Sequence, residues 1–275
     1  MSGFLDSAFA EAHRRVESWR RNDLLGALRD APVPRSPGGG LAAALRGSNP
    51  MALIAEIKRA SPSQGMLNPD VDVAGRARLY VDGGAAAVSI LTEPRWFAGS
   101  IDDFVTARRA TRAPLLRKDF IVDEYDLEVS AAIGADAVLL IAARFDADRL
   151  QELLAFANGL GLEALVETHG ADDAATACEA GAFIIGVNSR NLQTLQVDVE
   201  GALGALRLIP PDRLRVLESG INSQRDVQAA VEAGADAVLV GEVLMRSSDP
   251  AETIRLLLEG AEPRKPECNT GNNPD

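Results

Sequence analysis

The sequence is poor in the residues that build metal centres and disulfide frameworks. Its 275 residues include two cysteines, Cys178 and Cys268, and two histidines, His13 and His169. The cysteines lie far apart and share no metal-ligand spacing with the histidines, so we expect neither a zinc site nor a disulfide framework. This cysteine usage is typical of a reduced, cytoplasmic chain.

Positive charge and long apolar runs are also scarce. Asp and Glu total 40 against 28 Lys and Arg, which gives a formal net charge of -12 at pH 7. This charge opposes a general attraction to nucleic acid or anionic lipid. No stretch approaches the roughly 18 apolar residues of a membrane span, and Asp6 and Glu11 interrupt any apolar core of a signal peptide. We therefore expect a soluble, cytoplasmic protein with no nucleic-acid or membrane partner.

One phrase recurs with small changes about every 50 residues. Its four copies are GGAAAVSIL from Gly83, IGADAVLLI from Ile133, AGAFIIGVN from Ala180 and AGADAVLVG from Ala233. Each copy reads as the end of a helix, a glycine stop and a short apolar run that suits a strand buried on both faces. Parallel strands joined by helices are therefore expected.

Four further apolar runs alternate with these copies, at 52–57, 113–118, 162–167 and 213–218. Segments with apolar residues three or four positions apart, such as 123–133 and 146–160, predict helices between the strands. Eight strand-helix units indicate an α/β protein with a closed (β/α)8 (TIM) barrel. The alternative is an open doubly wound sheet, but no Gly-x-Gly-x-x-Gly turn follows any predicted strand.

The barrel is expected to be one domain with a segment on either side. Residues 1–50 are interpreted as a helical extension, because the stretch 4–21 places Leu5, Phe9, Ala12, Val16 and Trp19 on one helical face. Residues 51–260 form the predicted catalytic barrel. The tail 261–275 lacks an apolar pattern and is expected to be disordered.

Ionisable and amide side chains gather where the predicted strands end. These strand ends read Glu56-Ile57-Lys58, Lys118-Asp119, Glu167, Asn188-Ser189-Arg190 and Glu218-Ser219-Gly220. Active sites of such barrels lie at the C-terminal ends of the strands, so this cluster indicates a ligand site. Strand alternation puts Glu56 and Lys58 on the same side. The alternative for any one residue is a solvated rim or a structural ion pair.

Three segments suggest a phosphate ester as ligand. The loop RASPSQGMLNPDVD after the first strand contains Ser61, Ser63 and Gly65, which suit contact with an anion but are also ordinary turn residues. The stretches 218–222 and 240–244 follow the last two strands, where this fold often builds phosphate sites from backbone N–H groups.

Three side chains beside these strands have competing interpretations. His169 is expected to cap a loop rather than to act in catalysis. Trp96 and Phe97 suit either stacking on a ring or packing within the protein.

Seven strings, taken together in this order, resemble the indole-3-glycerol phosphate synthase family of tryptophan biosynthesis. They are IAEIKRASPSQG, LTEPRWFAGS, PLLRKDFIVDEYDL, ALVETH, IGVNSRNLQTLQVD, LESGI and GADAVLVGEVLM, and they span roughly residues 50 to 258. The resemblance implies conversion of 1-(2-carboxyphenylamino)-1-deoxyribulose 5-phosphate into indole-3-glycerol phosphate, with loss of carbon dioxide and water and without a cofactor or metal. Association with other enzymes of the pathway is a further expectation.

The resemblance also assigns roles to residues of this chain. Lys118 would be the general acid, Lys58 would hold the substrate carboxylate, and Glu167 would be the general base of dehydration. Glu56 would help to orient the lysines. Other substrate contacts fall on Glu218, Asn188, Arg190, Phe97 and Phe120. Phosphate contacts fall on Ser61, Ser219, Gly220, Gly241 and Glu242.

The sequence departs from the family pattern at three positions. Ser189 and Asn191 replace residues of the usual Asn-Asn-Arg-Asp-Leu string, and Glu242 stands where the family often has a small residue. Glu242 brings negative charge towards the phosphate, which suits binding only if its side chain points away.

Two other kinds of function are alternatives. One is another phosphosugar barrel, such as a Schiff-base aldolase or phosphoribosylanthranilate isomerase, although the isomerase family has a Cys at the end of the first strand, where this sequence has Glu56 to Lys58. The other is a non-catalytic sensor of a phosphorylated ligand or a partner subunit of a larger complex.

Overall fold

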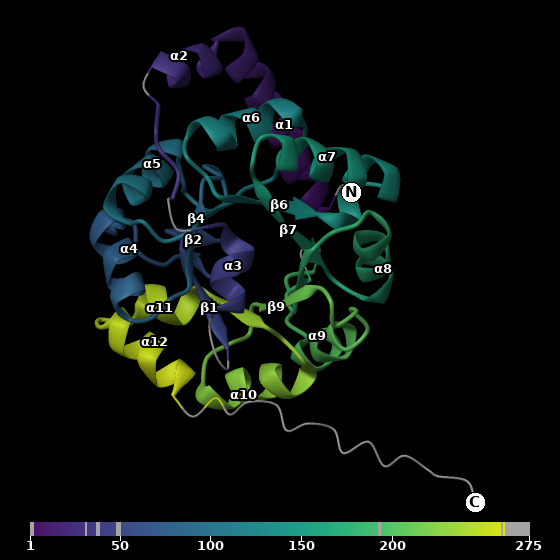
Figure 1. Cartoon of the computed structure of the whole chain (residues 1–275). Helices are drawn as coiled ribbons and strands as arrows, with labels where there is room; N and C mark the ends of the chain where they lie inside the picture. Colours follow the sequence, from purple (N-terminus) through teal and green to yellow (C-terminus); the bar gives the residue numbers. More distant parts are fainter. Residues whose placement is uncertain are drawn as a thin grey trace, which may run out of the picture.

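The computed structural model has a closed ring of strands surrounded by helices (Figure 1). It describes residues 3–30, 32–36, 39–47, 51–191, 194–259 and 261. Eight parallel strands pair in the order β1-β10-β9-β8-β7-β6-β5-β4, and β4 pairs with β1 to close the barrel. The strands are β1 (Ala52–Ile57), β4 (Ala87–Leu91), β5 (Leu115–Lys118), β6 (Ala137–Ile141), β7 (Glu163–Thr168), β8 (Ile184–Asn188), β9 (Leu214–Glu218) and β10 (Ala237–Val240). The predicted (β/α)8 barrel is confirmed.

Helices cover the outside of the ring. They are α4 (Val73–Asp82), α5 (Ile101–Ala110), α6 (Glu124–Ala132), α7 (Ala147–Gly159), α8 (Ala171–Glu179), α9 (Val199–Leu206), α10 (Gln224–Ala233) and α12 (Pro250–Leu258). The short helices η1 (Ala142–Arg144) and α11 (Glu242–Arg246) follow β6 and β10. In the recurring phrase, Gly84, Gly134, Gly181 and Gly234 all have φ between 82° and 100°. This backbone strongly favours glycine, so each copy of the phrase stops a helix just before a strand.

Alternation along the strands separates two apolar regions. Leu53, Leu115 and Val166 point outwards and pack under the helices. Ile54, Leu116 and Leu165 point inwards and fill the barrel. Ile57 belongs to the outer cluster and Glu56 lines the cavity at the barrel mouth, which confirms the predicted alternation at the end of β1.

The chain before β1 contributes to both ends of the barrel. It forms α1 (Phe4–Arg21), α2 (Leu24–Asp30) and α3 (Leu41–Arg46). Helix α1 buries its predicted apolar face, with Trp19 partly exposed, and its Phe9 packs on Phe120 beyond the end of β5. Helix α3 lies across the ring in Figure 1, and its Ala42 N–H donates a hydrogen bond to Glu163 at the start of β7. Helix α3 of the extension therefore closes the base of the barrel, and α1 forms part of the wall at its mouth.

Two other segments complete the description. The loop after β1 contains a small antiparallel hairpin, β2 (Ala60–Ser61) and β3 (Gly65–Met66), which the sequence patterns did not predict. Ala261 packs on the outer apolar cluster, and residues 262–275 of the predicted disordered tail lie outside the described residues. Within the described part of the chain, no helix is both long and apolar enough to cross a membrane.

Candidate active site

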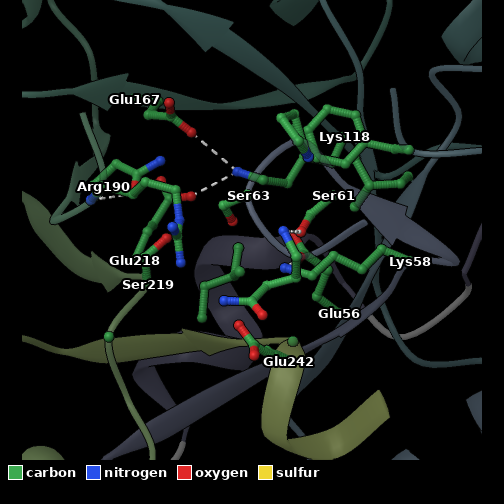
Figure 2. Close-up of a pocket in the computed structure, with 18 of the residues that line it drawn as sticks. Glu56, Lys58, Ser61, Ser63, Lys118, Glu167, Arg190, Glu218, Ser219 and Glu242 are labelled. Atoms are coloured by element: carbon green, nitrogen blue, oxygen red, sulfur yellow. Dashed lines mark hydrogen bonds and ion pairs between the residues drawn. The ribbon is translucent and has the colours of Figure 1, made fainter. Parts of the chain in front are cut away.

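A cavity of about 480 Å³ lies at the mouth of the barrel, where the carboxyl ends of the strands meet. Every residue to which the resemblance assigned a role lines this cavity, whereas Gly65 and Ser189 do not line it. Figure 2 shows side chains from both halves of the barrel and from the loop after β1 converging on one space. The structure thus brings the candidate residues together, while their individual roles stay predictions.

Lys118 lies between two carboxylates. Its Nζ is 2.6 Å from Glu218 Oε2 and 3.0 Å from Glu167 Oε2 (Figure 2). Lys118 points into the barrel because it lies two residues beyond the inward-facing Leu116. Burial lowers the pKa of Lys118, but the negative charges of Glu218, Glu167 and Glu56 outweigh it and leave this pKa above its ordinary value. Lys118 therefore carries a proton that it can donate.

The two carboxylates beside Lys118 differ in proton affinity. Burial raises the pKa of Glu218 to about 7, because the favourable charge of Lys118 only partly offsets desolvation and the nearby Glu167. Burial also acts on Glu167, but Lys118, His169 and Asn188 outweigh it and hold the pKa of Glu167 below its ordinary value. Glu167 is therefore ionised at neutral pH, whereas Glu218 takes up a proton more readily than Glu167. The three groups titrate as one coupled set.

A second ion pair lies on the inner face at the end of β1. Lys58 Nζ is 2.6 Å from Glu56 Oε1, and both side chains are largely buried. Gly241, just after β10, makes room for this pair, because a Cβ there would lie 2.5 Å from Glu56 Oε1 and 2.9 Å from Lys58 Nζ. The glycine therefore lets a cation reach the cavity beside the predicted phosphate loops.

The predicted phosphate contacts follow three neighbouring strands of the barrel, β9, β10 and β1. Ser219 and Gly220 both have left-handed backbone, with φ of 65° and 78°, directly after β9. Ser61 lies on the β2 hairpin, where its Oγ accepts a hydrogen bond from the N–H of Gln64 at 3.2 Å. The carboxylate of Glu242 is 3.4 Å from Arg246, one turn along α11. That cation partly compensates the charge of Glu242.

The other two departures from the family pattern lie off the cavity. Asn188 and Arg190 line the cavity, but the intervening Ser189 does not, because neighbouring strand residues point to opposite sides. Asn191 Oδ1 accepts a hydrogen bond from the N–H of Thr194 at 2.9 Å, within its own loop. Ser189 and Asn191 therefore lie outside the wall of this cavity.

Aromatic rings form another part of the cavity wall. Phe97 and Phe120 both line the cavity, with ring centroids 6.3 Å apart, and Phe4 of α1 lies 6.1 Å from Phe120. Trp96 packs on Phe4 at 5.4 Å and is not among the lining residues. Of the two interpretations offered for this pair, stacking on a ligand fits Phe97 and internal packing fits Trp96.

His169 lies outside this cavity, as expected for a residue that holds a loop. Its Nδ1 is 2.9 Å from the carbonyl oxygen of Asn188, and its backbone N–H donates to Asp173 at 3.0 Å. These contacts tie the loop after β7 to the end of β8.

Sequence reasoning missed the network behind Lys118. Asp119 Oδ1 is 2.7 Å from Arg15 of α1, and its Oδ2 is 2.9 Å from the buried Arg117 and 2.6 Å from Thr92 Oγ1. Burial opposes ionisation, but the two guanidinium groups prevail and lower the pKa of Asp119 to about 2. The network fixes α1 to the end of β5, next to Lys118. Only the acidic residue after Lys118 was visible in the sequence, because its partner Arg15 is 104 residues away.

Glu93 is a second residue that the sequence analysis did not select. It lies just after β4, lines the cavity and is 1% exposed. Glu93 follows the end of a barrel strand by two residues. This position could have identified it, because the other acidic residues of the site were predicted from their positions at strand ends.

Together, these features define a (β/α)8-barrel enzyme with paired acid and base groups at its mouth. The solved structure of a 3-hexulose-6-phosphate synthase from Salmonella typhimurium superposes with a TM-score of 0.60, over 75% of this chain and 96% of that one, at 16% identity. That likeness shows the fold alone. The sequence model of indole-3-glycerol phosphate synthase matches residues 5–257. The chain belongs to the indole-3-glycerol phosphate synthase family.

Individual relatives agree with this family. The chain is 42% identical to the indole-3-glycerol phosphate synthase of Mycolicibacterium vanbaalenii over 267 residues, which cover 97% of this chain and 96% of that protein. It is 43% identical to indole-3-glycerol phosphate synthase 2 of Streptomyces coelicolor, over 94% of this chain and 100% of that protein. A multifunctional tryptophan biosynthesis protein of Schizosaccharomyces pombe is 45% identical over 78% of this chain, which spans 29% of that protein.

Proposed function

We propose that this chain converts 1-(2-carboxyphenylamino)-1-deoxyribulose 5-phosphate into indole-3-glycerol phosphate, as a carboxy-lyase of tryptophan biosynthesis. The observation that carries the proposal is the position of Lys118 between Glu167 and Glu218, in a cavity that also holds a second lysine and the phosphate loops. The substrate has a ketone, a benzoate and a phosphate, and this cavity offers a complementary group for each.

Ring closure needs an acid at the ketone oxygen. The ring carbon that bears the carboxylate attacks the ketone carbon, and Lys118 donates a proton to the oxygen as the new C–C bond forms. The buried carboxylates keep Lys118 charged before this step. Glu218, with a pKa raised to about 7, is suited to exchange a proton with Lys118 afterwards.

Carbon dioxide then leaves the same ring carbon, and the electron pair of the broken bond returns to the ring. Lys58 is the cation that we assign to the substrate carboxylate, while Phe97 and Phe120 contact the benzene ring. Glu56 holds Lys58 at 2.6 Å and so fixes where that carboxylate lies. The cation attracts the carboxylate, and the aromatic wall excludes water from the reacting carbons.

Dehydration completes the indole. The hydroxyl formed at the former ketone leaves as water with a proton from a lysine, and Glu167 takes the proton that the neighbouring carbon loses. Glu167 suits a general base, because Lys118 and its other neighbours keep it ionised at neutral pH. Asn188, Arg190 and Glu218 orient the substrate from the ends of β8 and β9.

The phosphate is assigned to the loops after β1, β9 and β10. Ser61 and Ser219 offer hydroxyl groups, and Gly220 and Gly241 allow close approach of backbone N–H groups. Glu242 contributes through its N–H, while its side chain pairs with Arg246 at 3.4 Å.

A buried lysine in a barrel of this kind could also serve a Schiff-base aldolase, which is the second candidate function. An imine forms from a neutral amine, and the raised pKa of Lys118 disfavours that form. Borohydride treatment during turnover, followed by mass spectrometry of the protein, separates the two functions. An adduct on Lys118 would support the aldolase.

The proposal is tested by mixing the purified chain with the carboxyphenylamino-deoxyribulose phosphate in the presence of EDTA. Indole fluorescence and released carbon dioxide should rise together, in equal amounts. The dephosphorylated substrate is the matched control, and its kcat/KM should be lower by at least about 10²-fold because the phosphate contacts are lost. A folded protein that binds the phosphorylated compound without forming product would instead favour the sensor.

We also propose that the protein acts in the cytoplasm and associates with other enzymes of its pathway. The fused Schizosaccharomyces pombe relative supports association, because a homologous segment there belongs to a multifunctional tryptophan biosynthesis protein. Cell fractionation tests the location. Cross-linking the purified chain to the enzyme that consumes its product tests the association, with an unrelated acidic barrel protein as control.

A further inference from the structure

The loop after β4 is organised around the buried carboxylate of Glu93. Its Oε1 accepts a hydrogen bond from the N–H of Arg95 at 2.9 Å. Its Oε2 accepts hydrogen bonds from the N–H groups of Trp96 at 2.7 Å and Phe97 at 3.2 Å. The backbone carbonyl of Glu93 also accepts from the N–H of Gly99, at 2.9 Å. One residue therefore holds four backbone N–H groups of its own loop.

This loop has an unfavourable backbone shape that needs such support. Ala98 has a φ of 53°, a region that residues with a Cβ seldom adopt. Gly99 passes so close to the carbonyl of Leu91 that a Cβ there would collide with it. Without the carboxylate, three convergent N–H groups would lose the acceptor of their hydrogen bonds.

The loop supplies two parts of the active site. Phe97 lines the cavity and packs on Phe120, with centroids 6.3 Å apart. The carbonyl of Phe97 accepts a hydrogen bond from the N–H of Ala60 at 3.2 Å, next to Ser61 on the β2 hairpin. Movement of Phe97 would therefore disturb both the aromatic wall and the start of the phosphate loop.

The contacts of Glu93 argue against a role as an acid or base. Both carboxylate oxygens of Glu93 already accept backbone hydrogen bonds. By contrast, Lys118 contacts Glu167 and Glu218 across the cavity. The three N–H donors favour the ionised form of Glu93, although burial and Asp119 leave its pKa above the ordinary value. Glu93 thus holds the backbone of its own loop in place.

We propose that Glu93 is a positioning residue, whose carboxylate holds Phe97 where it contacts the aromatic ring of the substrate. The proposal rests on the proposed function, which supplies that ring. It adds a residue that acts on substrate affinity through the backbone of its loop, away from the proton transfers at Lys118.

Steady-state kinetics of four variants test the proposal: Glu93→Gln, Glu93→Asp, Phe97→Leu and the double variant Glu93→Gln/Phe97→Leu. Glu93→Gln turns an N–H₂ group towards backbone donors, and Glu93→Asp keeps the charge but falls one methylene short. Both should raise KM by about tenfold, with kcat within about threefold of wild type and an unchanged pH profile of kcat. In the double variant the KM changes should be far from additive, because both substitutions remove the same contact.

Fluorescence of Trp96 gives a readout that does not depend on turnover. The chain has two tryptophans, so the background variant Trp19→Phe leaves Trp96 as the only one. In that background, Glu93→Gln should shift the emission to longer wavelength and increase quenching by acrylamide, since Trp96 loses its backbone anchor. Glu93→Asp takes the place of Glu93→Gln if the latter does not fold.

Three results would overturn the proposal. They are a lower kcat with unchanged KM, additive KM changes in the double variant, or unchanged Trp96 emission. A wild-type protein that makes no product would contradict the proposed function instead, and the Trp96 emission would still decide the role of Glu93 in its loop.

Discussion

The base and the mouth of the barrel interior differ sharply, although the same strands build both. In β5, Leu116 faces the apolar interior and Lys118, two residues later, faces the cavity. In β7, Leu165 and Glu167 show the same change. The base is therefore packed like an ordinary core, and the mouth holds charges removed from water.

The comparison separates stability from chemistry within single strands. Burying Leu116 stabilises the barrel through the hydrophobic effect. Burying Lys118 with its carboxylates costs desolvation free energy. The ion pairs offset this cost but add little net stability to the fold. Buried charges that cost stability and gather at one end of the barrel are those expected to act on a ligand. The predictions below test this division, from the largest expected effect to the smallest.

Replacing Lys118 should have the largest effect. Lys118→Ala should lower kcat by about three orders of magnitude or more, because it removes the proton donor for ring closure. The fold should persist, since Glu218 already has a pKa of about 7 and can take up a proton when its cation is lost. Turnover assays and circular dichroism measure the two properties.

Leu116→Ala is the matched control in the same strand. It should lower the free energy of unfolding by about 2–5 kcal/mol and leave kcat of the folded protein within a few fold of wild type. Loss of kcat in Leu116→Ala, or near-normal kcat in Lys118→Ala, would contradict the division between base and mouth.

Glu167→Gln should uncouple the two products. The general base of dehydration acts after carbon dioxide has left, so indole formation should slow by about 10²–10⁴-fold while carbon dioxide release slows less. Rapid quenching with separate analysis of the two products measures this difference. Equal slowing of both would move Glu167 from dehydration to an earlier step.

Glu218→Gln should change how stability depends on pH. The pKa of Glu218 rises from 4.5 to about 7 on folding, so between these values the folded state holds a proton that the unfolded state has lost. This group therefore makes the free energy of unfolding fall as pH rises through that window, by at most about 1.4 kcal/mol per pH unit.

The Glu218→Gln variant lacks that titration, so its free energy of unfolding should fall less between pH 4.5 and 7 than that of wild type. Urea unfolding at several pH values measures both slopes. Identical slopes would mean that Glu218 does not titrate in this window.

Ser61→Ala should have the smallest effect. Loss of one phosphate hydrogen bond should raise KM by roughly threefold to tenfold and leave kcat nearly unchanged. Asn68→Ala is the matched control, because Asn68 lies on the same loop but is not among the residues that line the cavity. A fall in kcat alone for Ser61→Ala would contradict the phosphate assignment.

Most of the fold could be predicted from the sequence because the same local pattern, a glycine stop followed by an apolar run, recurs along the chain. Each predicted apolar run overlaps a barrel strand, and the left-handed glycines of the recurring phrase explain where the helices stop. The β2 hairpin was not predicted, since Ala60–Ser61 and Gly65–Met66 are too short for an alternating pattern. Their pairing depends on contacts such as the hydrogen bond from Ala60 to Phe97.

Site residues could be predicted from the sequence where they lie at the end of a single predicted strand. Glu56, Lys58 and Lys118 follow from strand ends and alternation alone. The ion pair between Arg15 and Asp119 joins α1 to β5 and has no local pattern. The loop that donates hydrogen bonds to Glu93 also has a left-handed residue at Ala98, and no residue type in that loop predicts such a turn.

The most direct test of the division between mouth and base is a single-turnover experiment with enzyme in excess over the ribulose phosphate substrate. Wild type and Lys118→Ala are compared under EDTA, with binding followed by protein fluorescence and chemistry by indole fluorescence and carbon dioxide. The account predicts that wild type forms both products in one turnover, while Lys118→Ala binds the substrate and forms neither at a comparable rate. Product formation by Lys118→Ala at the wild-type rate would contradict it.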